Sequence, residues 1–297
     1  MILFKSSSDD FFSIVGDKMI LIMPDNINQI KDNIKYYDGV ILSIDKYSVN
    51  SRYTLSIDEI KDIIKIIPDK EVFISINKNI ENNELDEVES ILVSLNELNI
   101  KGVLYGDVAL VTYKDKLNYD LVWAQEHLVT NYETINYWCD LGIKYAYLSS
   151  DLNINEISII ARNAKSKLMV NLFGYNSMFV SKRHIVKNYL KNFNIKDNSK
   201  IHYMKKEGKI YPIVDANYTY VFANNIFNGI KEYYNMDVDY YVVNGFLIDN
   251  EKLTKVLSII GNITKENVED YALQVMDSFA NIDTGFLYKD VVSKVKK

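Results

Sequence analysis

The feature that most constrains this sequence is a repeated alternation between short apolar runs and longer amphipathic segments. The apolar runs are continuous, as expected of strands buried on both faces of a parallel sheet. Between them, apolar residues recur at helical spacing, as the isoleucines at positions 57–67 do behind Ser56. The sequence therefore predicts parallel strands separated by helices, with the strands at residues 19–23, 39–44, 71–76, 101–105, 119–123, 144–148, 168–172 and 240–246.

The number of these units indicates the architecture. About eight βα units in succession favour an α/β fold, a (β/α)8 barrel of the TIM type, over an open doubly wound sheet. The regular pattern fails after residue 189, where short strands are expected at 200–205, 209–214 and 218–223, a hairpin turn at Glu207-Gly208 and a helix at 226–234. We interpret about residues 195–236 as a small β-rich insertion between the seventh and eighth units of a single barrel domain, residues 1–297.

Composition and charge limit the classes of partner and compartment. Lys and Arg number 34 against 40 Asp and Glu, and this net charge of −6 disfavours a general nucleic-acid binder while leaving room for a local basic groove. The single cysteine, Cys139, rules out an internal disulfide framework and a four-cysteine cluster within one chain. The N-terminus does not resemble a signal peptide and no apolar run approaches about 18 residues, so we expect a cytoplasmic protein with no membrane partner.

Common catalytic motifs are absent from the sequence. It contains no G-x-S-x-G elbow, no Walker loop, no G-x-G-x-x-G and no H-E-x-x-H. The histidines, His127, His184 and His202, share no metal-ligand spacing, so no metal site is predicted.

The residues that follow barrel strands are the candidates for function, because strand carboxyl ends meet at the face where barrel enzymes work. Residues 168–190 stand out: an apolar run breaks at Gly174, passes through small polar residues and continues as a basic, helix-like segment with Lys182, Arg183, His184 and Lys187. The substrate-binding candidates are Arg52, Asn77, Asp151, Gly174, Asn176, Ser181 and Arg183, and the catalytic candidates are Asp107, Ser177 and His184.

Each of these candidates also has a structural explanation. Asp107 could cap the segment after Gly106, and Asp151 could belong to a helix start. Arg183 is either a solvated helix charge or a group that holds a phosphate. The imidazole of His184 suits a general acid or base, although a single histidine without a visible partner is more often structural.

The order of several stretches resembles the peptidase U32 family, the collagenase-like proteases. Residues 102–107 resemble the family's strand and turn that end in Asp, and residues 128–131 with 138–144 resemble its "vtN…fw…lGvk" segment. Residues 173–189 resemble its "HG-lC-sySGrC-lSNY" signature, and residues 283–287 its closing Gly-Phe segment. The resemblance implies a barrel fold and adds Asn131 as a substrate-binding candidate.

The sequence departs from this family pattern at positions where the family has its chemically active signature residues. Phe173 stands where the family has its signature histidine, and Ser177 and His184 stand where it has two cysteines. In members that hydroxylate ubiquinone precursors, such cysteines help bind an iron–sulfur cluster. Serine and a lone histidine do not replace those thiolates, so we expect no iron–sulfur cluster and no other cofactor in this chain.

Three functional hypotheses follow from these observations. The resemblance is strongest to short members of Gram-positive bacteria, which implies a role in 5-hydroxylation of the wobble uridine of tRNA, beside a longer cysteine-bearing paralogue as a hetero-oligomer. The cluster Lys182, Arg183, Lys187 and Lys191 would then meet tRNA phosphates. The second hypothesis is a peptidase that uses Ser177 or Ser181 with His184. The third is a degenerate barrel that binds a small carboxylate through Arg52, Asn77 and Arg183.

Overall fold

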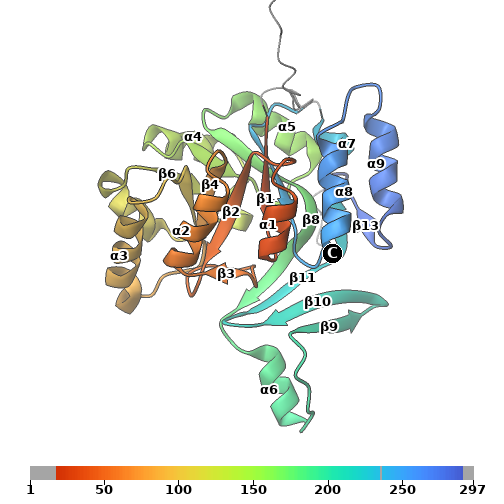
Figure 1. Cartoon of the computed structure of the whole chain (residues 1–297), viewed down its shortest axis with the longest axis horizontal. Coiled ribbons are helices and arrows are strands. Elements are labelled where there is room, and N and C mark those ends of the chain that lie inside the picture. Colours follow the sequence, from red (N-terminus) through yellow and green to blue (C-terminus); the bar gives the residue numbers. More distant parts are fainter. Residues whose placement is uncertain (1–17, 235, 290–297) are drawn as a thin grey trace, which may run out of the picture.

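Eight parallel strands close into a barrel. The computed structural model describes residues 18–234 and 236–289 (Figure 1). The last barrel strand pairs with both the first and the seventh, which closes the ring, and the predicted (β/α)8 barrel is confirmed. In barrel order the strands are β1 (Met19–Met23), β2 (Gly39–Ile44), β4 (Glu71–Ile76), β5 (Gly102–Tyr105), β6 (Asp120–Trp123), β7 (Tyr145–Tyr147), β8 (Lys167–Ser181) and β12 (Tyr240–Asn244).

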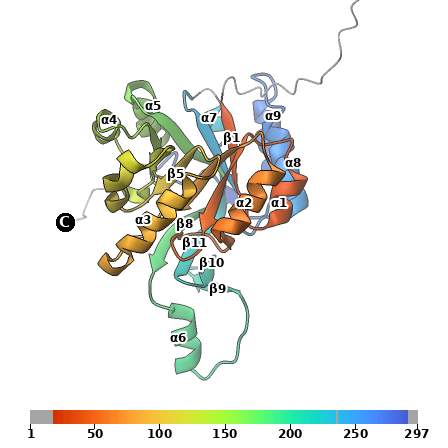
Figure 2. The ribbon, with the colours of Figure 1, turned by 60° about the vertical axis from the view of Figure 1, so that its left-hand side comes forward.

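Helices cover the outside of this barrel (Figures 1 and 2). The Ser56 hydroxyl and the Glu59 carboxylate each accept a hydrogen bond from the other's backbone N–H, which is the capping box expected from the sequence. The outer segments are α1 (Ile27–Asp32), α2 (Ile57–Ile66), α3 (Leu85–Leu95), the 3-10 segment η2 (Val108–Lys116), α4 (Tyr132–Asp140), α5 (Ile154–Asn163), α7 (Ile230–Tyr233), α8 (Asn250–Ile260) and α9 (Val268–Asp277). Shorter elements are β3 (Thr54–Leu55), η1 (Asn82–Glu84), η3 (Glu126–Leu128) and β13 (Ile282–Asp283).

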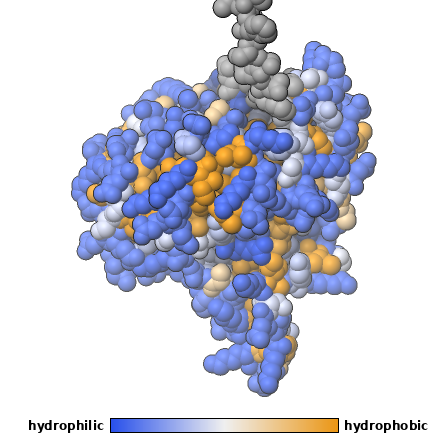
Figure 3. Space-filling model, viewed as in Figure 1, coloured by the Kyte–Doolittle hydropathy of each residue, from blue (hydrophilic) through white to orange (hydrophobic). Residues whose placement is uncertain are grey.

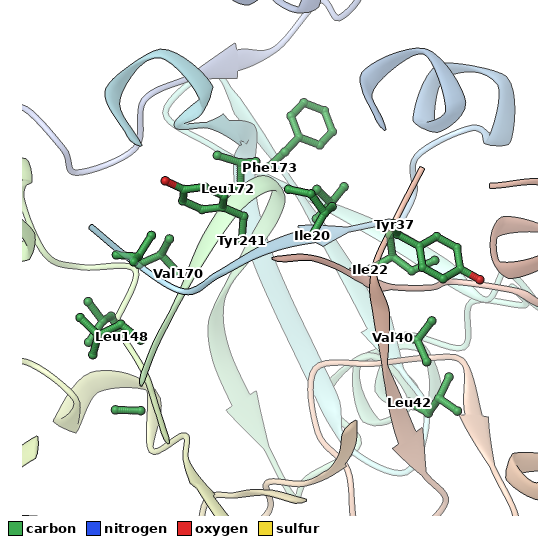
Figure 4. Packing of buried hydrophobic residues seen from close by; sticks show 14 of the residues in the cluster. Ile20, Ile22, Tyr37, Val40, Leu42, Leu148, Val170, Leu172, Phe173 and Tyr241 are labelled. Atoms are coloured by element: carbon green, nitrogen blue, oxygen red, sulfur yellow. The ribbon is translucent and has the colours of Figure 1, made fainter. Parts of the chain in front are cut away.

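The core has two layers, which explains why the strand sequences are continuously apolar. Along β1, Ile20 and Ile22 point outward to the helices, whereas Leu21 points into the barrel. Figure 4 shows part of the outer layer, with Phe173 and Tyr241 among its members. The barrel interior is filled by Leu21, Ile41, Phe73, Leu104, Val122, Ala124, Tyr145, Met169, Tyr240 and Val242.

An antiparallel extension projects from one end of the barrel (Figures 1 and 2). Strand β8 continues past the barrel and pairs with β11 (Thr219–Asn228); β11 pairs with β10 (Lys209–Asp215), and β10 pairs with β9 (Ile201–Lys206). Helix α6 (Ile185–Asn192) connects β8 to this sheet. We call residues 178–221 the arm. The predicted strands of the β-rich insertion are therefore present, and positive φ angles at Glu207 (53°) and Gly208 (78°) form the expected hairpin turn.

Two predictions about local structure were wrong. The chain does not break at Gly174, because β8 runs unbroken to Ser181 and finds β11 as a partner beyond the barrel. The predicted helix at 226–234 begins only at Ile230, because the preceding residues extend β11 as far as Asn228. In both cases long-range strand pairing overrides the local pattern.

Candidate functional site

A pocket of about 100 Å³ opens at the carboxyl ends of the barrel strands. Its polar lining includes five amide side chains, those of Asn50, Asn77, Asn171, Asn176 and Asn244. Among the described residues, neither lysine nor arginine lines this pocket. The remaining lining residues are Met23, Ser75, Leu104, Ala124, Glu126, His127, Tyr147, Leu148, Ser149, Ser150, Tyr175, Ser177 and Phe222.

A hydrogen-bonded chain crosses the pocket between three strand ends. Asn50 follows β2 with a φ of 64°, a left-handed conformation that asparagine adopts more readily than most residues. Its side-chain amide donates to the carboxylate of Glu126, which follows β6. The Ser177 hydroxyl on β8 donates to the side-chain Oδ1 of Asn50 at 2.7 Å. Asn50 therefore links the carboxylate of Glu126 to the hydroxyl of Ser177.

Two of the asparagines hold the pocket's own backbone. The Asn77 Oδ1 accepts a hydrogen bond from the Val49 N–H at 2.8 Å and fixes the loop after β2. The Asn244 Nδ2 donates to the Tyr175 carbonyl at 3.0 Å and joins β12 to β8. Because these amides already bond to backbone groups, we infer that they maintain the shape of the pocket and do not recognise a ligand.

Asn171 is different because part of its hydrogen-bonding capacity is unused. It lies on β8, and its Nδ2 donates to the side chain of Asn176. Its Oδ1 is buried and has no hydrogen-bond partner in the described part of the chain. A buried carbonyl oxygen without a donor carries a free-energy cost of about 1–3 kcal/mol. A ligand N–H that reached this atom would remove that cost.

Two titratable groups of the pocket, Glu126 and Tyr147, have a raised pKa. Burial raises the pKa of Glu126, and the nearby Asp151 acts in the same direction, while His127 and the Asn50 hydrogen bond oppose the shift. The Glu126 residue is nevertheless exposed, so solvent weakens this shift. Burial also raises the pKa of Tyr147, with a further contribution from Glu126. At the rim, His127 Nδ1 lies 2.6 Å from Asp151 Oδ2.

The structure brings some of the candidate residues to this pocket. Asn77, Asn176 and Ser177 line it. Asp151 reaches its rim through His127. Gly174 lies in β8 with a φ of 116°, and a Cβ at that position would lie 2.3 Å from the Asn244 carbonyl oxygen. Here glycine permits β8 and β12 to approach closely where the barrel closes.

Other candidates lie outside the pocket with partners of their own. Arg52 donates two hydrogen bonds to Asp25, with Nε 2.6 Å from Oδ1, so its charge is already matched. Asp107 accepts from the Ala109 N–H and caps η2, and Asn131 accepts from the Thr134 N–H and caps α4. The Ser181 hydroxyl accepts from the N–H of Arg183, and both belong to the arm.

The nucleophile and base of the peptidase hypothesis have separate partners. His184 Nδ1 faces Asp215 Oδ1 at 2.9 Å within the arm, whereas the Ser177 hydroxyl donates to Asn50 at the pocket. No hydrogen bond joins Ser177 to His184 in the described residues. Their closeness in sequence does not translate into a catalytic pair, because an extended strand separates them.

The positions of the family's signature residues do not fit an iron–sulfur cluster. Phe173 is fully buried, with its ring 5.4 Å from that of Phe279. Ser177 is at the pocket, His184 is in the arm, and Cys139 is on the outer helix α4. Within residues 18–234 and 236–289, no group of three or more His, Cys, Asp or Glu side chains is placed to hold a metal ion. The chain lacks both the thiolates and the convergence that a cluster requires.

Asn50 and Asn171 line the pocket but are not among the site residues predicted from the sequence. Asn171 could have been found, because it interrupts the otherwise apolar run of residues 168–172 at a position that points into the barrel mouth. Asn50 has no such signal, because tertiary packing carries its loop to Glu126. Glu126 and His127 directly follow the β6 segment, where functional residues are expected.

An eight-stranded parallel barrel with a polar pocket at the carboxyl ends of its strands defines a protein of the (β/α)8 class. Residues 25–290 match Peptidase family U32, and the chain belongs to this family. No helix in the described residues is both long enough and apolar enough to span a bilayer.

Individual proteins are also similar to this chain. The chain is 27% identical over 249 residues to "tRNA hydroxylation protein P2" of Bacillus subtilis (strain 168), covering 74% of this chain and 80% of that protein. Among solved structures, the U32 peptidase Mk0906 superposes with a TM-score of 0.52 at 15% identity, covering 82% of this chain and 96% of that one. This structural likeness shows the fold. A tryptophan synthase structure from Pyrococcus furiosus has a TM-score of 0.42 at 14% identity, covering 87% and 96%.

Proposed function

We propose that this chain takes part in hydroxylation of tRNA in the cytoplasm, at the 5-position of the wobble uridine, by holding the RNA. The similarity to tRNA hydroxylation protein P2 supports the process. The role in binding is supported by the Asn171 side chain at the wall of the pocket, whose buried Oδ1 accepts no hydrogen bond from the described residues.

The chemistry of the pocket suits a uracil ring. Uracil is uncharged and presents an N3–H donor between two carbonyl acceptors. The Asn171 Oδ1 would accept from N3–H, while the Asn176 amide, which also lines the pocket, would donate to a carbonyl. The volume of about 100 Å³ is below the roughly 300 Å³ of ordinary small-molecule sites, which favours a single ring over a whole nucleotide. Enzymes that act on a base in RNA bind it unstacked in a close pocket of this kind.

The oxidation itself is assigned to another chain. Conversion of a C–H bond to C–OH is a two-electron oxidation and requires a redox group. The single cysteine and the positions of Phe173, Ser177 and His184 do not supply a cluster site here. We therefore propose that a longer cysteine-bearing paralogue carries the redox centre and that this chain is its partner subunit.

The experiment is a deletion of the gene followed by mass spectrometry of tRNA nucleosides. Loss of 5-hydroxyuridine-type nucleosides is expected, with recovery when the wild-type gene is restored. Unchanged nucleosides would refute the proposed function. For the partnership, the tagged chain should be purified from cells and the longer paralogue sought by mass spectrometry. Its absence would refute the assignment of a partner subunit without affecting the role in tRNA hydroxylation.

A further inference from the structure

Positive charge is concentrated in the arm of an otherwise acidic protein. Residues 182–209 carry nine Lys and Arg against two acids, a net charge of +7, although the whole chain has −6. The rest of the sequence therefore carries −13. Segregation of this size indicates a surface that meets a polyanion. The cations are Lys182, Arg183, Lys187, Lys191, Lys196, Lys200, Lys205, Lys206 and Lys209.

These cations lie on projecting elements and are largely unneutralised. Helix α6 buries none of its residues, and β9 is exposed from Tyr203 to Lys206. In the described part of the chain, Lys182 is the one of the nine that pairs with a carboxylate, that of Glu81. Figure 3 shows the arm standing clear of the barrel, with a mainly hydrophilic surface interrupted by apolar side chains.

Exposed aromatic rings accompany the charges. On α6, Tyr189 and Phe193 are 57% and 58% exposed, and their ring centroids lie 4.7 Å apart. Lys187 and Lys191 are spaced by four residues along the same helix, so they share one face. Tyr203 on β9 is 63% exposed. Cations interleaved with exposed aromatic rings are the combination that binds single-stranded nucleic acid, through phosphate contacts and base stacking.

The arm and the pocket share one strand. Tyr175, Asn176 and Ser177 of β8 line the pocket, and the same strand enters the arm at the next residue. Ser181, where β8 ends, is four residues beyond Ser177, or roughly 13 Å along an extended chain. A polynucleotide on the arm would therefore run beside the pocket mouth.

We propose that the arm is an RNA-binding surface, which holds the phosphate backbone of a single-stranded loop and stacks its bases on α6. This inference rests on the proposed function in taking that loop to be the anticodon loop of tRNA. A polyanion is favoured over a protein partner because the excess of +7 stands against the acidity of the remaining chain. A protein interface on the arm is an outcome that the experiment below detects.

The test compares two purified full-length variants, each lacking four lysines. The arm variant combines Lys187→Ala, Lys191→Ala, Lys205→Ala and Lys206→Ala. The control variant changes lysines on outer helix α2 and at the amino ends of barrel strands, away from the arm: Lys61→Ala, Lys65→Ala, Lys144→Ala and Lys165→Ala. Circular dichroism checks that both variants fold.

Binding of a fluorescein-labelled anticodon stem–loop RNA is measured by fluorescence anisotropy across a series of salt concentrations. If the four lysines contact phosphates, the slope of log K against log salt becomes shallower by about 3 in the arm variant, at about 0.7 per contact. The control variant should keep the wild-type slope. A Tyr189→Ala, Phe193→Ala double variant should weaken binding by about tenfold with little change in slope, because stacking is not ionic.

Several results would overturn the inference. These are a wild-type protein that does not bind the RNA, an arm variant with the wild-type slope, or equal losses in both lysine variants. An arm variant that binds RNA normally but no longer purifies with the longer paralogue would identify a protein interface instead. The gene deletion tests the proposed function separately. Unchanged tRNA nucleosides after deletion would refute that function, whatever the arm binds.

Discussion

The close approach of β8 and β12 at Gly174 gives the sharpest prediction about stability. In a Gly174→Ala variant, the new Cβ would lie 2.3 Å from the Asn244 carbonyl oxygen and 2.7 Å from the Asn244 Cβ. Ordinary contacts begin at 3.4 Å, so the two strands must separate by about 1 Å where the barrel closes. The φ of 116° is a further cost for any residue with a Cβ.

The magnitude can be separated into these two contributions with a matched control. Gly208 also has a positive φ, 78°, but a Cβ there would meet nothing within 4 Å. Gly208→Ala should therefore cost only the conformational part, about 1 kcal/mol. Gly174→Ala adds overpacking of about 1–3 kcal/mol, which gives a total loss of about 2–4 kcal/mol in the free energy of unfolding.

Urea unfolding followed by circular dichroism measures both variants. With a slope of about 3 kcal/mol per molar urea, the midpoint of Gly174→Ala should fall by about 1 M or more, and that of Gly208→Ala by a few tenths. Equal midpoints for the two variants would show that the contact with Asn244 does not limit the position of β8, and would refute the argument.

Three further predictions concern the residues around the pocket. Arg52→Ala should lower the free energy of unfolding by about 3 kcal/mol in urea titrations, because it leaves the Asp25 carboxylate, 4% exposed, without its cation; an unchanged midpoint would contradict this. The raised pKa of Glu126 means that the folded state holds its proton more tightly, so this group's contribution to stability declines as pH rises from 4.5 through the folded pKa. Glu126→Gln should therefore remove that decline in urea titrations across this range, and a variant with the wild-type pH profile would disprove the assigned shift. Asn171→Leu should unfold at the same urea concentration as the wild type or slightly higher, because it removes a buried oxygen that has no donor among the described residues. The same variant should fail to restore tRNA hydroxylation in the deletion strain. Full restoration would show that Asn171 does not take part in recognition.

The sequence predicts the barrel well for a physical reason. Strands buried on both faces must be apolar throughout, so their positions are visible as continuous runs such as Ile20 to Ile22. The length of β8 is not visible, because its second half depends on β11, whose pairing residues lie 38 to 53 positions further along the chain. Gly174 has the appearance of a strand end, although its role is to bring β8 close to Asn244.

The pocket lies at the strand ends where the sequence places the candidate site, but only some of the candidate residues line it. The family signature directs attention to Ser177 and to His184, yet only Ser177 reaches the pocket. The isolated Arg52 suggested an anion site, and the structure instead pairs it with Asp25 from the loop after β1. Such pairings between distant loops follow from the closed barrel and cannot be read from local patterns.

The most direct test of the account is ultraviolet cross-linking of the chain to tRNA in cells, with mass spectrometry of the peptides that carry nucleotide adducts. The account predicts adducts within residues 182–209 of the arm and within residues 171–177 at the pocket wall, in complexes that contain tRNA. Adducts confined to the outer helices of the barrel, or the absence of cross-linked tRNA, would contradict it.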